Sequence, residues 1–413
     1  MTTTGFEQRA ADPAQNSDWT NVAEEAAYLA ALAASSQRVA VAVAGQSVEG
    51  RDLRVVTVAH PSARTSARPA VLIVGAQHGD EGSGREGLLQ MIREWATTTD
   101  PETVAYLSRV RLVCIPTANP DRIRIWDNGT RENAAAVDLN RDHYAVTQPE
   151  SSVIQRAITD FRPVMIVDLH DHGSGTGGRC GYQTSRHPQA STDILRLGAA
   201  LVDELVAAAP ANGFASYIFT GASPVEPTLR TQGALRHAVT LLAEADRNPT
   251  PDLFPRVERV EMHKSTLRHV VRFHAARWDE INGAAMASRV SAQIDGTNGG
   301  RPFNFANGVR TLSIPSGYSL SAAQVSSNAR LLAAMGWQSV VDGDATIVPT
   351  AQPDQRLIPF VFDARATERA VPATAATVPP TAHTTGLQRD GRRALVAVAQ
   401  PYWEPGAIVP AKV

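Results

Sequence analysis

The stretch Ala70-Val-Leu-Ile-Val-Gly-Ala-Gln-His-Gly-Asp-Glu-Gly82 decides how this chain folds, because an apolar run passes directly into a polar turn. Residues 70–75 are almost continuously apolar, which is typical of a short strand buried on both faces of a sheet. Residues 85–95 then show the apolar spacing of a helix. A buried strand followed by a helix is the repeating unit of an α/β sheet.

Further apolar runs of the same kind follow along the chain, at residues 110–115, 164–169 and 238–242. Helical stretches at 153–160 and 193–209 separate them. We therefore predict an α/β fold with a mixed, mostly parallel central sheet and helices on both faces. In sheets of this kind, ligands bind just beyond the carboxyl ends of the strands.

The apolar runs lead into residues that are common in metal and catalytic sites, namely His78, Glu81, His170 and Glu244. A catalytic zinc site combines three imidazole or carboxylate ligands with an open position. Each residue alone has an ordinary alternative, because a histidine can lie in a core and a glutamate at a helix start favours the helix dipole. His172 is a rival ligand to His170, since side chains two apart on a strand share a face.

Charge and composition exclude several classes of partner. The formal net charge of −2 gives no electrostatic case for binding nucleic acid or an anionic membrane. No apolar run approaches the ~20 residues that a membrane span needs. Residues 1–18 lack the basic start and apolar stretch of a signal peptide. We therefore expect a cytoplasmic protein, unless an export signal was removed from this chain, which leaves secretion open.

The character of the chain changes twice along its length. We expect a flexible N-terminus at residues 1–20, a catalytic domain at 21–298 and a small α+β accessory domain at 299–413.

Local patterns give finer expectations for the second half of the chain. Residues 257–285 form a long helical pattern rich in His and Arg, for which we expect a solvated face. In the accessory domain we predict a helix at 322–335 and strands at 357–362 and 395–399. A Pro/Ala/Thr-rich loop at 364–383 separates these strands.

The loop after the second apolar run carries the most specific motif, which reads Asn119-Pro-Asp121, then Arg131-Glu-Asn133, then Val137-Asp-Leu-Asn-Arg-Asp142. This ordered pattern resembles the zinc carboxypeptidase family, the carboxypeptidase A-like metallopeptidases. The resemblance runs from about Ala23 to Glu244 and includes the hairpin at 45–52. Ala136 stands where the family usually has glycine.

The resemblance implies roles, residue by residue, for a metal site. The ligands of a single zinc ion per chain correspond to His78, Glu81 and His170. Asp138 matches an acceptor that orients the first histidine from outside the ligand set. From the sequence alone, Asp168 and Asp171 are further candidates for orienting an imidazole.

The resemblance also implies residues that face the substrate. Asn140 and Arg141 match the pair that receives the terminal carboxylate, which a guanidinium binds through two parallel hydrogen bonds. Arg131 is implied as the group that stabilises charge on the attacked carbonyl, with Arg124 as a rival. Glu244 matches the general base that takes a proton from zinc-activated water.

One departure concerns the mobile tyrosine of the family. Ala222 occupies the corresponding position, and the nearest tyrosine, Tyr217, is out of register. The neighbouring segment carries Thr228-Leu-Arg230 instead. We expect Arg230 to bind a carboxylate of the substrate, such as an acidic side chain, with a solvated loop arginine as the ordinary alternative.

Together these patterns predict a zinc-dependent peptidase of the carboxypeptidase type, which hydrolyses an amide bond near a free carboxylate of a peptide or small amide. One alternative is an N-acyl amino acid deacylase resembling succinylglutamate desuccinylase or aspartoacylase. The other is an inactive carboxypeptidase-like binding module, which predicts the loss of a ligand or of the base. The complete loop motif and the hairpin at 45–52 favour the peptidase.

Overall fold

The structure of the 413-residue chain is a computed structural model. It describes residues 2–11, 18–61, 68–123, 130–173, 179–221, 223–247, 256–297, 302–305, 309–311, 313–366 and 370–376.

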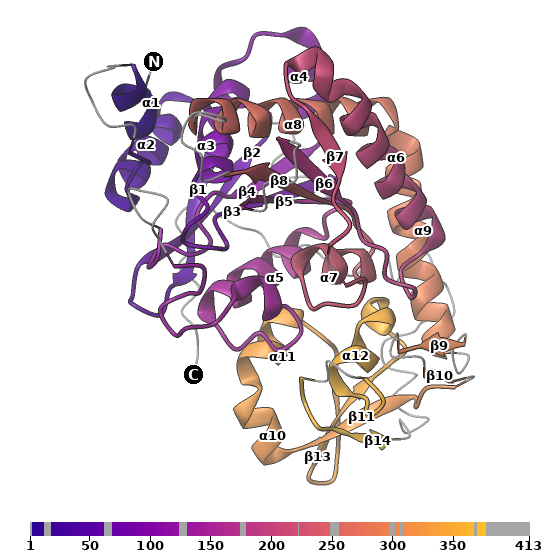
Figure 1. The fold of residues 1–413 in the computed structure, drawn as a ribbon. Coiled ribbons are helices and arrows are strands. Elements are labelled where there is room, and N and C mark those ends of the chain that lie inside the picture. The colour runs from indigo at the N-terminus through magenta and orange to yellow at the C-terminus, as the bar shows by residue number, and fades with distance from the viewer. Residues whose placement is uncertain are drawn as a thin grey trace.

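An eight-stranded sheet runs through the centre of this described part (Figure 1). Its strands, in order across the sheet, are β1 (Val39–Gln46), β2 (Asp52–Val58), β4 (Arg111–Ile115), β3 (Ala70–Gly75), β5 (Met165–His172), β8 (Val239–Asp246), β6 (Cys180–Gln183) and β7 (Ser216–Ile218). The middle strands β4, β3, β5 and β8 pair in parallel, as do β6 and β7. The pairs β1–β2, β2–β4 and β6–β8 are antiparallel. The predicted mixed, mostly parallel sheet is confirmed.

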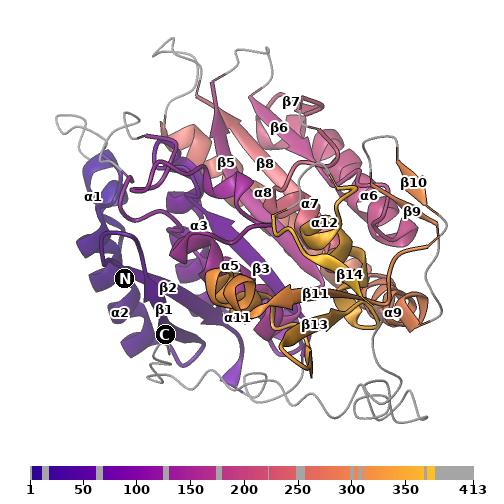
Figure 2. The ribbon, with the colours of Figure 1, turned by 90° about the horizontal axis from the view of Figure 1, so that it is seen from below.

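Helices cover both faces of this sheet (Figures 1 and 2). The core of one face includes side chains from α2 (Val22–Ser35), α3 (Ser83–Thr97), α4 (Pro101–Leu107), α6 (Thr192–Ala208), α8 (Arg256–Ala276) and α9 (Trp278–Thr297). The core of the other face includes side chains from α5 (Pro149–Phe161) and α7 (Leu229–Leu235). Single-turn 3-10 segments lie at Leu139–Arg141, Ala209–Asn212 and Pro353–Arg356. None of the described helices is long and apolar enough to cross a membrane.

The side chains of β5 alternate between these two layers, which decides where its polar residues point. Leu169 belongs to the core beneath α3 and α8, whereas Ile166 packs in the core that contains α5. Asp168 and His170 follow Ile166 at two-residue steps and therefore face the α5 side. Asp171 faces the opposite way, toward α8.

Part of the N-terminus is packed onto the domain, where a flexible segment was expected. Helix α1 (Gly5–Ala10) forms there, and Phe6 is buried with its ring 4.9 Å from that of Trp19. The carboxylate of Glu7 binds the guanidinium of Arg93 on α3 at 2.6 Å. These contacts hold α1 against the domain of the eight-stranded sheet.

The described residues from 302 to 376 form an α+β unit below α5 and α7 (Figures 1 and 2). It contains a four-stranded antiparallel sheet, a two-stranded sheet and three short helices. These are β12 (Val340–Asp342), β13 (Ala345–Pro349), β11 (Gly317–Ser321) and β14 (Thr374–Ala376), then β9 (Phe303–Asn304) and β10 (Arg310–Thr311), with α10 (Ala322–Ser327), α11 (Ala329–Met335) and α12 (Ile358–Phe362). We call it the C-terminal unit, residues 302–376. Its apolar core continues into the domain of the eight-stranded sheet at Tyr144, Val146 and Leu235.

Two expectations for this unit need correction. The strand predicted at 357–362 is wrong, because these residues include helix α12. The whole run is buried, and a short buried strand cannot be told from a buried helix by periodicity. The helix predicted at 322–335 is interrupted at Asn328, between α10 and α11. The strand predicted at 395–399 lies outside the described residues, as does half of the loop at 364–383, and the described half of that loop includes strand β14.

The helical pattern at 257–285 belongs to α8 and α9, and the expected solvated face is only part of α8, because some of its basic residues are buried. Arg259 and His263 on α8 are buried and contact the two carboxylate oxygens of Asp171, each at 3.3 Å. Burial raises the pKa of Asp171, but the hydrogen bond from His263 and the charge of Arg259 outweigh it and lower the pKa. The basic residues of α8 therefore neutralise a buried carboxylate.

We expect Arg259→Leu to reduce the free energy of unfolding by about 3 kcal/mol, because removing one partner leaves a buried carboxylate short of compensation. Urea unfolding followed by circular dichroism measures the change. Arg268→Leu is the matched control on the same helix, since its ion pair with Glu94 is partly exposed and should contribute less than about 1 kcal/mol. Equal losses in the two variants would contradict this view of α8.

Candidate metal centre and active site

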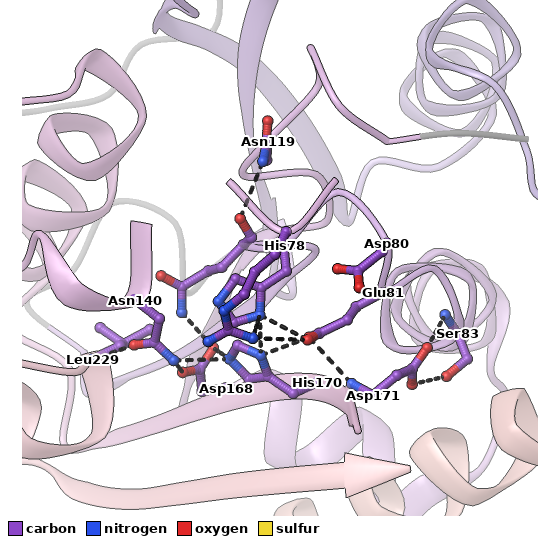
Figure 3. A network of polar contacts seen from close by, with 12 residues as sticks. His78, Asp80, Glu81, Ser83, Asn119, Asn140, Asp168, His170, Asp171 and Leu229 are labelled. Carbon is purple, nitrogen blue, oxygen red and sulfur yellow. Dashed lines mark hydrogen bonds and ion pairs between the residues drawn. The ribbon is translucent and has the colours of Figure 1, made fainter. Parts of the chain in front are cut away.

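Three side chains from two separate segments converge in the structure: His78, Glu81 and His170, which we call the His–Glu–His cluster (Figure 3). Nδ1 of His78 lies 2.7 Å from Glu81 Oε1, and Nδ1 of His170 lies 2.7 Å from Glu81 Oε2. The two Nδ1 atoms are 3.1 Å apart. All three side chains are buried. This donor set, two imidazoles and one carboxylate, is one that zinc accepts.

The turn between β3 and α3 supplies two members of the cluster. It begins at Ala76, whose φ of 48° lies in the left-handed region. A Cβ on Gly79 would overlap the backbone and side chain of Arg122, so the turn can pack this closely only with glycine there. Glu81 Oε2 also accepts a hydrogen bond from the backbone N–H of Asp171 at 3.2 Å. The turn and β5 are thereby joined at the cluster itself.

Each imidazole of the cluster is held from behind by a carboxylate. His78 Nε2 lies 3.1 Å from Asp138 Oδ1, and His170 Nε2 lies 2.9 Å from Asp168 Oδ1. Burial lowers the pKa of His170, but the carboxylates of Asp168 and Glu81 outweigh it and raise the pKa. With each Nε2–H donated to a carboxylate, the Nδ1 lone pairs face one another across the cluster, as metal ligation requires.

The two other candidates on β5 point elsewhere. The Nε2 atom of the rival ligand His172 lies 2.7 Å from the hydroxyl of Tyr217 on β7. Asp171 bonds to Ser83 and to α8, so it contacts neither imidazole of the cluster. Asp168 alone of the two flanking aspartates orients a histidine of the cluster.

Glu244 stands beside the cluster because of strand register. The parallel pairing of β5 with β8 aligns His170 with Glu244, so the two side chains emerge on the same face. Oε2 of Glu244 is buried and has no hydrogen-bond partner among the described residues. Burial raises the pKa of Glu244 to about 7, with the neighbouring histidines opposing this and Glu81 adding to it.

Arg131 lies at the solvent-facing rim of the cluster. Its Nε donates to Asp138 Oδ2 at 2.9 Å, and its Nη1 lies 3.2 Å from His78 Nδ1. The side chain is 41% exposed, so one side of the guanidinium faces outward. The rival Arg124 lies outside the described residues.

Asn140 is more deeply engaged than the sequence suggests. Its Nδ2 donates to Asp168 Oδ2 at 3.2 Å, and its Oδ1 accepts from the backbone N–H of Leu229 at 2.9 Å. Both ends of the amide are therefore used within the protein. Arg141 differs, because its side chain is 44% exposed and its Nη2 lies 3.5 Å from Glu226 Oε2.

Arg230 is buried rather than solvated, at 3% exposure, on the first turn of α7. Its Nη2 donates to the carbonyl of Ser223 at 3.3 Å, and its Nε has no hydrogen-bond partner among the described residues. Burial lowers its pKa to about 10, and the nearby charges include Glu226, Arg186 and Arg141. Among the described residues no ion pair joins Arg230 to a carboxylate, so its buried guanidinium is able to accept an anion.

Sequence reasoning missed a buried layer of polar side chains behind the cluster. Gln77 donates from Nε2 to Asp168 Oδ1 at 2.7 Å, and His143 Nε2 lies 2.8 Å from Gln77 Oε1. Both residues are fully buried. No spacing in the sequence links residues 77 and 143, although Gln77 does directly precede His78.

Comparison with known proteins agrees with this geometry. Residues 25–205 match the family model described as zinc carboxypeptidase. This part of the chain is similar to the zinc carboxypeptidase family. The family is zinc-dependent, and the His–Glu–His cluster lies within the matched residues and is able to bind a metal ion. The match ends before α7 and before Glu244.

Relatives and solved structures extend the comparison. Carboxypeptidase SOL1 of Arabidopsis thaliana is 33% identical over 139 residues, which cover 30% of this chain and 28% of that protein. Human carboxypeptidase D is 30% identical over 142 residues, which cover 30% of this chain and 10% of that protein. The chain thus matches less than a third of the length of these relatives.

A metallo-carboxypeptidase from Burkholderia cenocepacia superposes with a TM-score of 0.52 at 20% identity, over 62% of this chain and 70% of that one. This likeness shows that the chain has the carboxypeptidase fold.

The cluster leads to a prediction about metal content. We expect about one zinc ion per purified chain, and we expect His170→Ala to lose it because a ligand is removed. Elemental analysis after dialysis measures this. His172→Ala is the matched control two residues away, and it should keep its zinc. Zinc retained by His170→Ala but lost by His172→Ala would make His172 the ligand.

Proposed function

We propose that this protein is a zinc-dependent peptidase of the carboxypeptidase type, which hydrolyses an amide bond near a free carboxylate. The observation that carries the proposal is the position of Glu244, which lies beside His170 with a buried oxygen that has no hydrogen-bond partner among the described residues. An inactive binding module would be expected to have lost a ligand or the base. This chain keeps candidates for all of them.

Zinc, when bound, supplies Lewis acidity that acidifies water and polarises a carbonyl. Glu244 then acts as the general base, taking a proton from the attacking water and delivering it to the departing amine. A pKa raised to about 7 suits this work near neutral pH, because a base is most effective when its pKa lies near the working pH. The outward side of Arg131 is suited to stabilise the negative charge that develops on the attacked carbonyl oxygen.

Arg141 is the candidate that receives the terminal carboxylate, since its guanidinium is partly exposed and can form two parallel hydrogen bonds. Asn140 supports this from behind: its side chain holds the start of α7, and its backbone carbonyl accepts a hydrogen bond from Arg141 Nη1 at 2.9 Å. In this proposal Asn140 positions the substrate-binding arginines.

Arg230 gives the proposed substrate a second anionic feature. Arg141 and Arg186 lie close enough to Arg230 to lower its pKa, and the carboxylates of Glu226 and Asp168 oppose them. The excess of positive charge favours an acidic side chain next to the terminal carboxylate. A small N-acyl amino acid with two carboxylates would satisfy the same charges, which keeps the deacylase as a second candidate.

We expect Glu244→Gln to lower kcat at least ~1,000-fold while zinc content stays at the wild-type level, because the change removes the base but no ligand. The measurement is hydrolysis of benzoylglycyl dipeptide substrates, with elemental analysis of the same preparations. A variant that retains more than a tenth of the wild-type rate would refute the base role of Glu244.

We expect Arg230→Leu to lower kcat/KM for benzoylglycyl-glutamate by about 10- to 100-fold, since a charge-assisted hydrogen bond is lost. Cleavage of benzoylglycyl-phenylalanine should change by less than about 3-fold. Arg186→Leu provides a neighbouring control that removes the same charge from a more exposed position. Equal losses on both substrates would remove the acidic preference and leave the peptidase proposal standing.

A panel that adds N-succinyl and N-acetyl amino acids separates the two enzyme candidates. Turnover of these compounds without cleavage of any peptide would replace the peptidase by the deacylase.

A further inference from the structure

A continuous series of buried polar side chains, which we call the polar relay, leads from the back of the His–Glu–His cluster to the C-terminal unit. Starting at His170, its members follow in the order Asp168, Gln77, His143, Gln155 and Arg236. The side chains from Asp168 to Gln155 are at most 1% exposed, and Arg236 is 8% exposed. They come from β5, the turn after β3, the segment after Arg141, α5 and the residue after α7.

The hydrogen bonds of the polar relay can be donated in one direction only, from Arg236 toward Asp168. Arg236 can only donate, and its Nη1 lies 3.4 Å from Gln155 Oε1, which also accepts from Gln232. With Oε1 of Gln155 used as an acceptor, its Nε2 donates to Nδ1 of His143 at 2.9 Å.

The direction continues to the metal side. His143 Nδ1 is an acceptor, so its proton is on Nε2, which donates to Gln77 Oε1 at 2.8 Å. Gln77 Nε2 then donates to Asp168 Oδ1 at 2.7 Å. An ionised carboxylate accepts hydrogen bonds and cannot donate one. Both ends of the polar relay therefore enforce the same direction of donation.

The ionisation of the members agrees with this polarity. Burial lowers the pKa of His143 to about 4, so the ring is neutral near pH 7 and keeps one lone pair to accept with. At the metal end, Asp168 Oδ1 accepts from Gln77 Nε2 and lies 2.9 Å from His170 Nε2, as the donor-only Arg236 at the other end requires.

We propose that His143 is a positioning residue for the metal site, which acts through Gln77 and Asp168 to hold His170 with its Nδ1 lone pair directed at the metal. This role of His143 rests on the same zinc site as the proposed peptidase activity, but it does not depend on which substrate is cleaved. Groups behind metal ligands are typically worth about 10- to 100-fold in metal affinity or activity. His143 is separated from the ligand His170 by three successive hydrogen bonds.

The polar relay also links the C-terminal unit to the His–Glu–His cluster. Arg236 Nη2 binds Asp354 Oδ2 at 3.1 Å and the carbonyl oxygen of Met335 at 3.5 Å. Both acceptors belong to the C-terminal unit, on the far side of α5 and α7 from the sheet (Figure 1). The orientation of Gln155, at the start of the relay, thus depends on a guanidinium that this unit holds in place.

The test compares zinc affinity in two variants of one residue. His143→Leu removes both hydrogen bonds and should raise the zinc Kd about 10- to 100-fold. His143→Gln keeps an N–H in the place of Nε2 and should stay within about 3-fold of the wild type. Zinc Kd is measured by competition with a chromophoric chelator at pH 7.5, and circular dichroism checks folding. The readout needs no catalytic activity.

A matched control separates positioning from simple loss of stability. His274 is also fully buried, with its pKa lowered to about 4 by burial and its Nδ1 2.8 Å from the Tyr106 hydroxyl. His274→Leu should lower the melting temperature and leave the zinc Kd unchanged. If His143→Leu does not fold, Gln155→Leu, which withdraws the donor to His143, should raise the Kd about 3- to 10-fold.

Three outcomes would overturn the proposal. The first is folded His143→Leu, or Gln155→Leu in its place, with wild-type zinc affinity. The second is an equal loss of zinc affinity in His143→Leu and His143→Gln, which would indicate that the ring acts through packing. The third is absence of zinc binding by the wild type. Failure to cleave any peptide, with the expected zinc pattern intact, would instead count against the peptidase and support the relay.

Discussion

The parallel pairing of β5 with β8 is the interaction on which the rest of the site depends. Residues 74 positions apart in the chain, His170 and Glu244, become neighbours through this register. A shift of one residue would turn one of the two side chains to the opposite face of the sheet. Both strands are buried by helices on either side, and their apolar residues hold the register because any slip would expose them.

The alternation of side chains on β5 also divides the buried charges between two layers. Asp168 serves the metal cluster on the α5 side, and Asp171 is neutralised by α8 on the other. Burying an ionised carboxylate is costly, so each must be compensated by donors that do not move. These partners make the scaffold around His170 rigid from both faces, which is what a metal site of defined geometry needs.

The C-terminal unit belongs to this scaffold by its contacts. It shares an apolar core with Tyr144 and Leu235, which lie near Arg141 and Arg230 in the sequence. Arg236 adds an ion pair with Asp354 across the same boundary. The segments that carry the proposed substrate-binding arginines are therefore supported from behind by this unit.

The sequence by itself determined the α/β architecture, the strand ends that carry polar residues, and the ordered motif that indicated the carboxypeptidase family. These features are local, because apolar runs and short spacings record burial and turns. Only the tertiary structure decided that His170 rather than His172 joins the cluster, and that α8 covers a buried aspartate. The tertiary structure alone placed residues 358–362 in a helix, and it alone brought His143 into contact with Gln77. Such choices depend on contacts between distant segments, and local periodicity carries no information about which segments meet.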